Sequence, residues 1–248
     1  MGDYRILAKD WDALLPKEEI FKQKDFFQKI IDQYSVRTCL DCACGTGWHL
    51  YMLDGLGVES YGSDLSPEMI SLAGINTADK GIVLKEVDYR CLGDSWDIKF
   101  NMIICMSNSF RHMIEQNDID GALNSMYNQL NDGGILVIDN GLSDQLIEAR
   151  PKLLPGRILS DQAFYFILEY PNDNEIVFNI LNVKKTKDSF EHSFETMHLS
   201  AMKHSDYEKC FSRTRFESID YFGGYDFSKY SPEESSRMIV IAQKYSAV

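Results

Sequence analysis

A glycine-rich turn and three evenly spaced carboxylates are the residues of this sequence best suited to bind a small ligand. Asp41 ends a short apolar run before Gly45-Thr46-Gly47, Asp64 follows 23 residues later, and Asp88 comes 24 residues after that. Glycines let the backbone turn sharply and approach a ligand without a Cβ in the way. A carboxylate at the distance of Asp64 can accept hydrogen bonds from both hydroxyls of a ribose. Asp88, with Tyr89 beside it, can accept one from the exocyclic amine of an adenine, so the spacing predicts an adenosine-like ligand.

The residues after the turn distinguish this ligand from a dinucleotide. Trp48, His49 and Leu50 follow Gly47, so the third glycine of the dinucleotide-binding pattern G-x-G-x-x-G is missing. That glycine brings a helix N-terminus close to a pyrophosphate, and a ligand without phosphate does not need it. Asp41 also lies within the strand end, which favours a cationic ligand. A nicotinamide-dependent dehydrogenase remains an alternative interpretation.

Alternating strands and helices must position these residues. The expected strands are 38–43, 58–63, 82–87, 100–106 and 135–139, and the expected helices are 17–34, 48–56, 66 onward and 118–130, with a turn at 131–134. This alternation predicts a Rossmann-like, doubly wound and mainly parallel α/β sheet. Ligands bind such sheets outside the carboxyl ends of the strands, which is where all three carboxylates fall.

The alternation stops near residue 157. From 158 to 202 the pattern is typical of antiparallel strands joined by polar turns such as Pro171-Asn172-Asp173-Asn174, and we expect an inserted β lid or substrate cover. A last helix and two strands should then close the main sheet. The predicted division is an N-terminal helical segment with the ligand-binding core at 1–157, the lid at 158–202 and the closing elements at 203–248.

Composition and charge limit the class of partner. The 248 residues are 44% hydrophobic and 25% charged, with a formal net charge of −13. This acidity argues against nucleic acid, because phosphate backbones require clustered Lys and Arg. No apolar run reaches the roughly 18–20 residues that span a bilayer, and residues 1–5 carry no secretory pattern, so we expect a cytoplasmic protein without a membrane partner. The six cysteines lack paired metal-ligand spacing, and we expect buried free thiols and no metal site.

Three segments together resemble class I S-adenosylmethionine-dependent methyltransferases. They are LDCACGTG at 40–47, SDLSPEM at 63–69 and ICMSNSFRHM at 104–113. More narrowly, they resemble the glycine and sarcosine N-methyltransferases, which show the patterns D-x-A-C-G-T-G, D-x-S-x-x-M and I-C-x-x-N-S-F-x-H. GYDFSKY at 224–230 extends the likeness toward the C-terminus. The resemblance implies the seven-stranded class I fold and an enzyme that converts S-adenosylmethionine to S-adenosylhomocysteine.

Carried over position by position, the resemblance assigns cofactor contacts and two catalytic residues. The implied cofactor contacts are Tyr4, Trp11, Lys22, Asp41, Ala43, Gly45, Thr46, Gly47, Asp64, Leu65, Asp88, Tyr89, Met106, Ser107 and Ser109. The implied catalytic residues are His112 and Asn108, which would face the methyl donor or acceptor. Loop capping by His112, a turn role for Asn108 and core packing of Tyr89 are the alternative interpretations.

One position departs from the family, and it concerns the methyl acceptor. The family binds an amino-acid carboxylate through the Arg of an R-N-Y-D segment, whereas this chain has Gly141 in that place and Ser143 in place of the tyrosine. A buried carboxylate without a cationic partner is costly. Either Arg111, Arg150 or Arg157 replaces the missing side chain, or the acceptor is not glycine. The second alternative is our expectation.

We therefore expect methyl transfer to a small-molecule acceptor, first of all an amine, by in-line displacement at a sulfonium. His112 can take a proton if one must leave. Methylation of oxygen or carbon and a non-catalytic S-adenosylmethionine-binding protein are the alternatives. The chain is expected to act as a monomer or homodimer.

Overall fold

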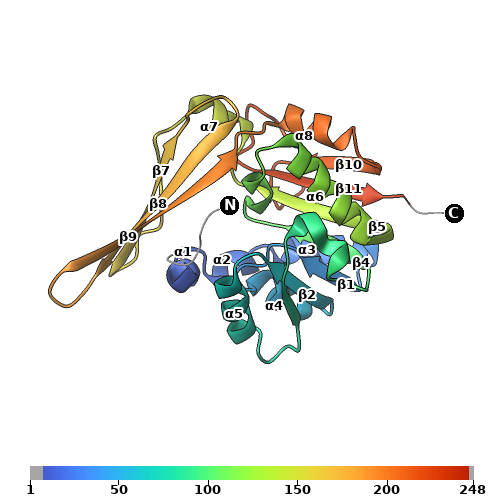
Figure 1. Ribbon diagram of the computed structural model, residues 1–248, viewed down its shortest axis with the longest axis horizontal. Helices are drawn as coiled ribbons and strands as arrows, with labels where there is room; N and C mark the ends of the chain where they lie inside the picture. The colour runs from blue at the N-terminus through green and yellow to red at the C-terminus, as the bar shows by residue number, and fades with distance from the viewer. Residues whose placement is uncertain (1–7, 246–248) are drawn as a thin grey trace.

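The computed structural model describes residues 8–245, which form an α/β body with a separate antiparallel sheet that projects from it (Figure 1). The strands of the main sheet are β1 (Thr38–Asp41), β2 (Glu59–Asp64), β3 (Val83–Glu86), β4 (Phe100–Cys105), β5 (Leu130–Asn140), β10 (Phe216–Phe222) and β11 (Met238–Lys244). Their order is β10-β11-β5-β4-β1-β2-β3. β1 to β5 pair in parallel, whereas β11 runs antiparallel to both β5 and β10. The predicted doubly wound fold is confirmed.

Helices cover both faces of this sheet. They are η1 (Ala8–Asp10), α1 (Trp11–Leu14), α2 (Lys17–Phe21), α3 (Lys24–Tyr34), α4 (Trp48–Asp54), α5 (Pro67–Asn76), η2 (Tyr89–Asp94), η3 (Ser109–His112), α6 (Gln116–Gln129), α7 (Asp144–Ala149) and α8 (His204–Phe211). Within residues 8–245 no helix is long and apolar enough to cross a membrane.

Two local predictions were wrong. The single helix expected over 17–34 is divided between α2 and α3, and the side chain of Gln23, at the division, lies with its Oε1 3.1 Å from His49 Nε2. The turn expected at 131–134 is the irregular beginning of β5. Phe100 pairs with Leu130 and Met102 pairs with Ile135, so the residues between them bulge out of the ladder.

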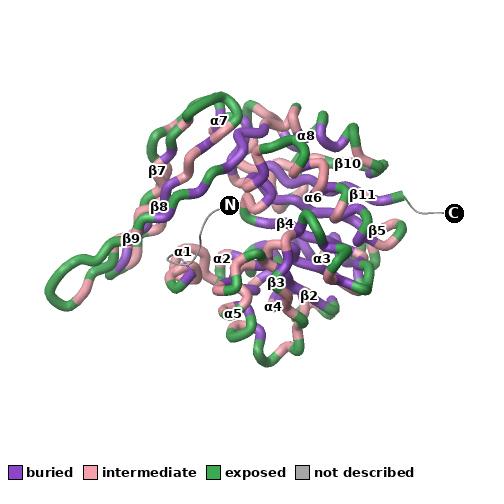
Figure 2. Tube along the Cα trace, viewed as in Figure 1, coloured by how far each residue is buried: buried purple, intermediate pink, exposed green. Residues whose placement is uncertain are grey.

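The central strands are buried on both faces, as parallel strands between helix layers must be (Figure 2). Along β11 the apolar side chains alternate between the two core clusters. Met238 and Val240 join the cluster that includes α6 and α8, whereas Ile239 and Ile241 join the cluster under α3. Each such buried side chain contributes roughly 1.5–3 kcal/mol of transfer free energy. Five of the six cysteines are also buried, but Cys91 is exposed, so the expectation of buried thiols fails there.

The separate sheet, which we call the lid sheet, consists of β6 (Leu153–Leu154), β7 (Gln162–Glu169), β8 (Glu175–Lys185) and β9 (Phe190–Ser200), in this order. All its strands pair antiparallel. β6 lies before the boundary that we expected at residue 158. The inner face of the sheet, with Phe164 and Leu168, packs in one cluster with Trp11 and Leu14 of α1.

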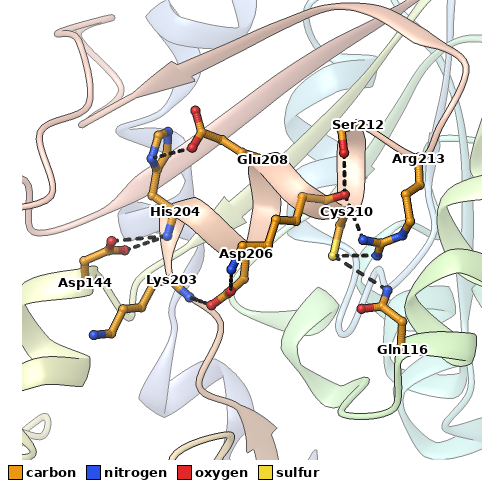
Figure 3. Close-up of polar contacts among 10 residues, drawn as sticks. Gln116, Asp144, Lys203, His204, Asp206, Glu208, Cys210, Ser212 and Arg213 are labelled. Atoms are coloured by element: carbon orange, nitrogen blue, oxygen red, sulfur yellow. Dashed lines mark hydrogen bonds and ion pairs between the residues drawn. The ribbon is translucent and has the colours of Figure 1, made fainter.

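Buried polar residues fix the root of the lid sheet to the body. The guanidinium of Arg111 is fully buried and donates to the carbonyls of Ser200 and Met202 at 2.9 Å and of Leu142 at 2.7 Å. The Asp144 carboxylate accepts from the backbone N–H of His204 at the start of α8, as Figure 3 shows. These contacts hold the chain where it leaves the lid sheet and returns to the main sheet.

Candidate active site

A cavity of about 430 Å³ lies at the carboxyl ends of β1, β2 and β4. The cavity is lined by twelve of the residues that we predicted from the sequence, namely Trp11, Ala43, Gly45, Thr46, Asp64, Leu65, Asp88, Tyr89, Met106, Ser107, Ser109 and His112. Its volume is within the usual range of small-molecule sites. The sequence therefore located most of the wall of one cavity.

The glycine turn is shaped by two left-handed backbone conformations. Gly45 has a φ of 51° and Gly47 a φ of 86°, which side chains rarely adopt. Gly45 lines the cavity, whereas Gly47 does not and packs instead against α5. A Cβ at Gly47 would lie 3.1 Å from the Cβ of Ala73. The absence of a side chain at Gly47 thus lets the glycine turn pack closely against α5.

Asp64 connects the ends of β1 and β2. One carboxylate oxygen accepts from the backbone N–H of Gly45 and the other from the N–H of Ser66, both at 2.9 Å. Burial raises the pKa of Asp64, and these hydrogen bonds oppose the shift. An ionised carboxylate has about four lone-pair sites, so two remain to accept the hydroxyls of a ribose. The residue fits the role that its spacing predicted.

Asp88 lines the cavity but already has a strong partner. Arg90 donates to both carboxylate oxygens from its Nε, and its Nη2 lies 2.6 Å from Oδ2. Arg90 also donates to Asp118 at 2.8 Å. Burial raises the pKa of Asp88, but the hydrogen bonds and charge of Arg90 outweigh burial and hold that pKa below its usual value. Asp88 is therefore an ionised acceptor at neutral pH.

Asp41 lies behind the cavity wall rather than in it. It is fully buried; Oδ1 accepts from the N–H of Ala43 at 3.2 Å, and Oδ2 has no hydrogen-bond partner among the described residues. Burial raises its pKa to about 8; the Ala43 hydrogen bond opposes the shift and the charge of Asp64 adds to it. A direct cofactor contact at Asp41 has no support in this geometry.

The N-terminal helix closes one side of the cavity through a contact that the sequence did not reveal. Asp12 of α1 accepts from the hydroxyl of Thr46 at 2.6 Å and from Asn76 Nδ2 at 3.1 Å. Asn76 also donates to the carbonyl of Thr46 at 2.9 Å. Trp11, the neighbour of Asp12, thereby faces the turn, with its Nε1 within 3.8 Å of the position of a Cβ on Gly45.

Two histidines face the cavity in uncharged form. Burial lowers the pKa of His112 to about 4, and burial lowers that of His49 to about 4 against the opposing charge of Asp139. His49, on the first turn of α4, was not predicted. Both rings can exchange hydrogen bonds with a ligand at neutral pH, but as bases they are weak.

Other lining residues were also missed by sequence reasoning. They are Leu15, Ile20, Cys42, Cys44, Trp48, His49, Ser66, Pro67, Glu68 and Met69. Most of them flank predicted residues along the chain, and adjacency to the turn or to Asp64 could have indicated them. Leu15 and Ile20 come from the N-terminal helices, and no local pattern predicts their position.

Besides Asp41 and Gly47, three predicted residues do not lie in the cavity wall or cannot be placed. Asn108 has a φ of 67°, and its Oδ1 accepts from the N–H of Gly141 at 2.7 Å, so it links two loops, as a turn residue would. Lys22 lies at the surface and pairs with Glu19 at 2.6 Å. Tyr4 lies outside the described residues.

None of the three arginines proposed to replace the missing family Arg reaches the cavity. The Arg111 guanidinium donates to backbone carbonyls where the lid sheet joins the body, Arg150 pairs with Asp173, and Arg157 lies 3.9 Å from Glu19. The arginine beside Gly141 is instead Arg237, which sequence reasoning did not consider. Its Nη2 is 3.7 Å from the position of a Cβ on Gly141, while its Nη1 pairs with the buried carboxylate of Asp139.

The cavity wall suits S-adenosylmethionine better than a metal or a dinucleotide. Asp64 keeps acceptor sites on its carboxylate, and Asp88 and Tyr89 line the same cavity without a phosphate-binding Lys or Arg among the described lining residues. Among residues 8–245, no three His, Cys, Asp or Glu side chains come together as a metal site requires.

Comparisons with known proteins agree with this geometry. A family profile described as a methyltransferase domain matches residues 39–134. The chain is 31% identical over 150 residues to the glycine/sarcosine N-methyltransferase of Parasynechococcus marenigrum, covering 60% of this chain and 51% of that protein. It is 33% identical over 101 residues to the dTDP-3-amino-3,6-dideoxy-alpha-D-glucopyranose N,N-dimethyltransferase of Streptomyces fradiae, covering 40% and 38%. The chain thus spans about half the length, or less, of these relatives.

The fold is similar over its whole length to solved structures. With a crystal structure of an S-adenosylmethionine-dependent methyltransferase from Clostridium acetobutylicum, the TM-score is 0.83 at 20% identity, covering 98% of this chain and 99% of that chain. The matched domain, the strand order and the cavity at the glycine turn all agree. The chain therefore contains a methyltransferase domain over residues 39–134, and its whole fold is that of the class I methyltransferases.

Proposed function

We propose that this chain transfers the methyl group of S-adenosylmethionine to the nitrogen of a small amine that carries no carboxylate. The charge of the cavity wall is the observation that carries the proposal. In the part of the chain that the structure describes, this wall includes Asp64, Glu68 and Asp88, two uncharged histidines, and neither Lys nor Arg. A buried carboxylate on the acceptor would need a cationic or multiply hydrogen-bonded partner.

The cofactor itself carries one carboxylate, on its methionine part. Trp48 and His49 line the cavity and open α4, where the first backbone N–H groups of a helix have no partner within the helix. Such N–H groups bind carboxylates without a cationic side chain. This end of α4 can serve the cofactor, and a second carboxylate on the acceptor would then find no cation in the wall.

When bound, S-adenosylmethionine would supply an electrophilic sulfonium methyl group: the nitrogen lone pair would attack its carbon in line, and the carbon–sulfur bond would break to release S-adenosylhomocysteine. Trp11, Leu15 and Ile20 form an apolar side of the cavity that excludes water and favours the uncharged amine over its ammonium form. His112 is itself uncharged, so it can accept a hydrogen bond from an amine N–H and orient the lone pair. A pKa of about 4 makes it a positioning group rather than a strong base.

The relatives suggest two classes of acceptor to compare. One is named for glycine and sarcosine, which carry a carboxylate, and the other for a nucleotide-linked amino sugar, whose amine stands on a ring without one. The cavity wall favours the amino-sugar ring of the second class, and the anionic diphosphate of a nucleotide-linked sugar would have to lie outside this wall. We infer that the acceptor is an amine on a neutral or polyhydroxylated small molecule.

The test is a methyl-transfer assay with S-adenosylmethionine and a panel of glycine, sarcosine, simple alkyl amines and amino sugars, free and nucleotide-linked. We expect S-adenosylhomocysteine release with amines that lack a carboxylate, and product analysis should place the new methyl group on nitrogen. Turnover of glycine at a rate equal to or above that of every other amine would overturn the acceptor class. A methyl group found on oxygen or carbon would overturn N-methylation.

A further inference from the structure

The lid sheet exposes large apolar side chains on one face only. Five large apolar residues of this region are exposed, with exposed fractions between 39% and 74%, namely Leu153, Ile158, Tyr165, Phe190 and Phe194. Directly opposite residues of antiparallel strands point to the same face of a sheet. The register therefore decides whether these five side chains lie together or on opposite faces.

The register places all five on the face turned away from α1, which we call the outer lid face. Tyr165 pairs with Leu181, and Leu181 pairs with Phe194. Leu153 pairs with Ile167, two residues along β7 from Tyr165, and Ile158 bridges to Ala163, two residues in the other direction. Phe190 lies four residues from Phe194 on β9, and side chains alternate along a strand. The five side chains thus share one face.

An antiparallel sheet with one buried face normally presents polar residues on the other. Here the inner face is packed against α1 and α7, yet the outer lid face also carries these five large apolar side chains, beside polar residues such as Asn179, Thr196 and His198. Figure 1 shows the lid sheet projecting from the body, and within residues 8–245 these side chains stay exposed. Contiguous apolar surface of this kind marks an interaction site on soluble proteins.

We propose that the outer lid face is the contact surface of a homodimer. The chain carries a net charge of −13, so two copies repel each other over most of their surfaces. The outer lid face carries acidic side chains at one end, Glu169 and the Glu175 that pairs with His198, and the basic Lys185 at the other. Glu169 lies at one end, beside Val177, and Lys185 lies at the other, beside Phe190. Both residues are exposed.

A two-fold axis that packs two outer lid faces with antiparallel strands brings Glu169 of each copy toward Lys185 of the other. The face is therefore complementary to itself, as a two-fold interface must be. Three strands about 4.8 Å apart and roughly 36 Å long offer about 500 Å² per copy, or about 1,000 Å² in total. This area reaches the lower limit of a specific interface. The inference is independent of the proposed acceptor.

Sedimentation velocity of the full chain at 1–100 µM tests the proposal. The wild-type chain should sediment as a dimer, and Phe194→Lys should raise the dimer dissociation constant at least 100-fold. Ile75→Lys is the matched control, because Ile75 is 70% exposed on α5, away from the lid sheet, and it should leave the dimer unchanged. Unchanged far-UV circular dichroism of both variants shows that the fold is kept.

Charge exchange tests the arrangement itself. Glu169→Lys and Lys185→Glu should each raise the dissociation constant by about 3- to 10-fold at low salt, because each places like charges together across the axis. The double variant should return it to within about twofold of the wild type. A wild-type chain that remains monomeric at 100 µM, or a dimer that Phe194→Lys leaves intact, would overturn the proposal. Single exchanges without effect, or a double exchange without restoration, would overturn the antiparallel arrangement.

Discussion

Replacing Asp64 by Asn tests whether the carboxylate at the end of β2 binds the cofactor's ribose. The wild-type carboxylate accepts from Gly45 and Ser66 through different oxygens, both at 2.9 Å. Asparagine has one oxygen, so its amide N–H₂ must face one of these two N–H groups. The variant loses one backbone hydrogen bond and places two donors against each other.

The expected size of the effect follows from these contacts. A hydrogen bond to a charged group is worth roughly 1.5–3 kcal/mol, and leaving a buried donor unpaired costs roughly 1–3 kcal/mol. Loss of one charge-assisted acceptor for the ribose should therefore weaken binding of S-adenosylhomocysteine by about 10- to 150-fold. The free energy of unfolding should fall by roughly 1–3 kcal/mol, through the unpaired backbone N–H.

The pH dependence of binding provides an independent measure. Burial raises the pKa of Asp64 in the free chain, and ribose hydroxyls bind its ionised form better than its protonated form. Affinity for S-adenosylhomocysteine should thus fall as the pH falls through this raised pKa, and Asp64→Asn should remove that dependence. Isothermal titration calorimetry over a pH series measures both effects.

A control separates the cofactor site from general damage to β2. Glu59→Gln changes a carboxylate at the opposite end of the same strand, where Glu59 is exposed and accepts from the Tyr61 hydroxyl. It should leave affinity for S-adenosylhomocysteine unchanged. If folded Asp64→Asn bound S-adenosylhomocysteine within threefold of the wild type, the ribose assignment would be refuted.

Three further predictions follow from other contacts. Asp12→Ala removes the hydrogen bonds from Thr46 and Asn76 that hold α1 over the cavity, so S-adenosylhomocysteine should dissociate about 10-fold faster in stopped-flow experiments. Because burial raises the pKa of Asp41 to about 8, the folded state retains a proton that the unfolded state loses above its ordinary pKa of 3.8. Stability of the ligand-free chain should therefore fall as the pH rises from 4 to 8, and Asp41→Asn should flatten this slope in urea titrations. A Cβ at Gly62 would meet Leu50 at 2.4 Å, so Gly62→Ala should lower the free energy of unfolding by roughly 1–3 kcal/mol; Gly121→Ala, in open space on α6, should raise it by roughly 0.5–1 kcal/mol.

The sequence predicted the main sheet well because strands such as β1 and β4 are apolar runs with a polar residue at or just after the carboxyl end. Cys39 and Leu40 are fully buried before Asp41, whereas β2 is a mostly polar strand that its position before Asp64 indicated. Strand ends meet at one edge of a parallel sheet, so most residues at these ends reach the same cavity. Local pattern and global arrangement agree there.

Contacts between distant segments could not be read in this way. Asp12 meets Thr46 and Asn76 across 34 and 64 residues, and neither its type nor its spacing distinguishes it from the other acidic residues of the chain. Arg237 reaches Asp139 across 98 residues, from the position just before β11, the strand that pairs antiparallel with β5. Such pairs depend on how the strands order themselves, which composition and periodicity do not specify.

The surroundings of Gly141, where the sequence resemblance would place an arginine, are also fixed by such distant contacts. With no side chain at Gly141, its backbone N–H donates to Asn108, and Arg237 fills the adjacent space. Arg237 does not restore the missing function, because its guanidinium pairs with Asp139 and donates to the Tyr225 hydroxyl at 3.2 Å. An alanine would fit at position 141, since its Cβ would meet neighbours at 3.5 Å or more. A longer side chain would have to displace Asn108 or Arg237, so return to the family's carboxylate-binding arginine requires changes at distant positions as well.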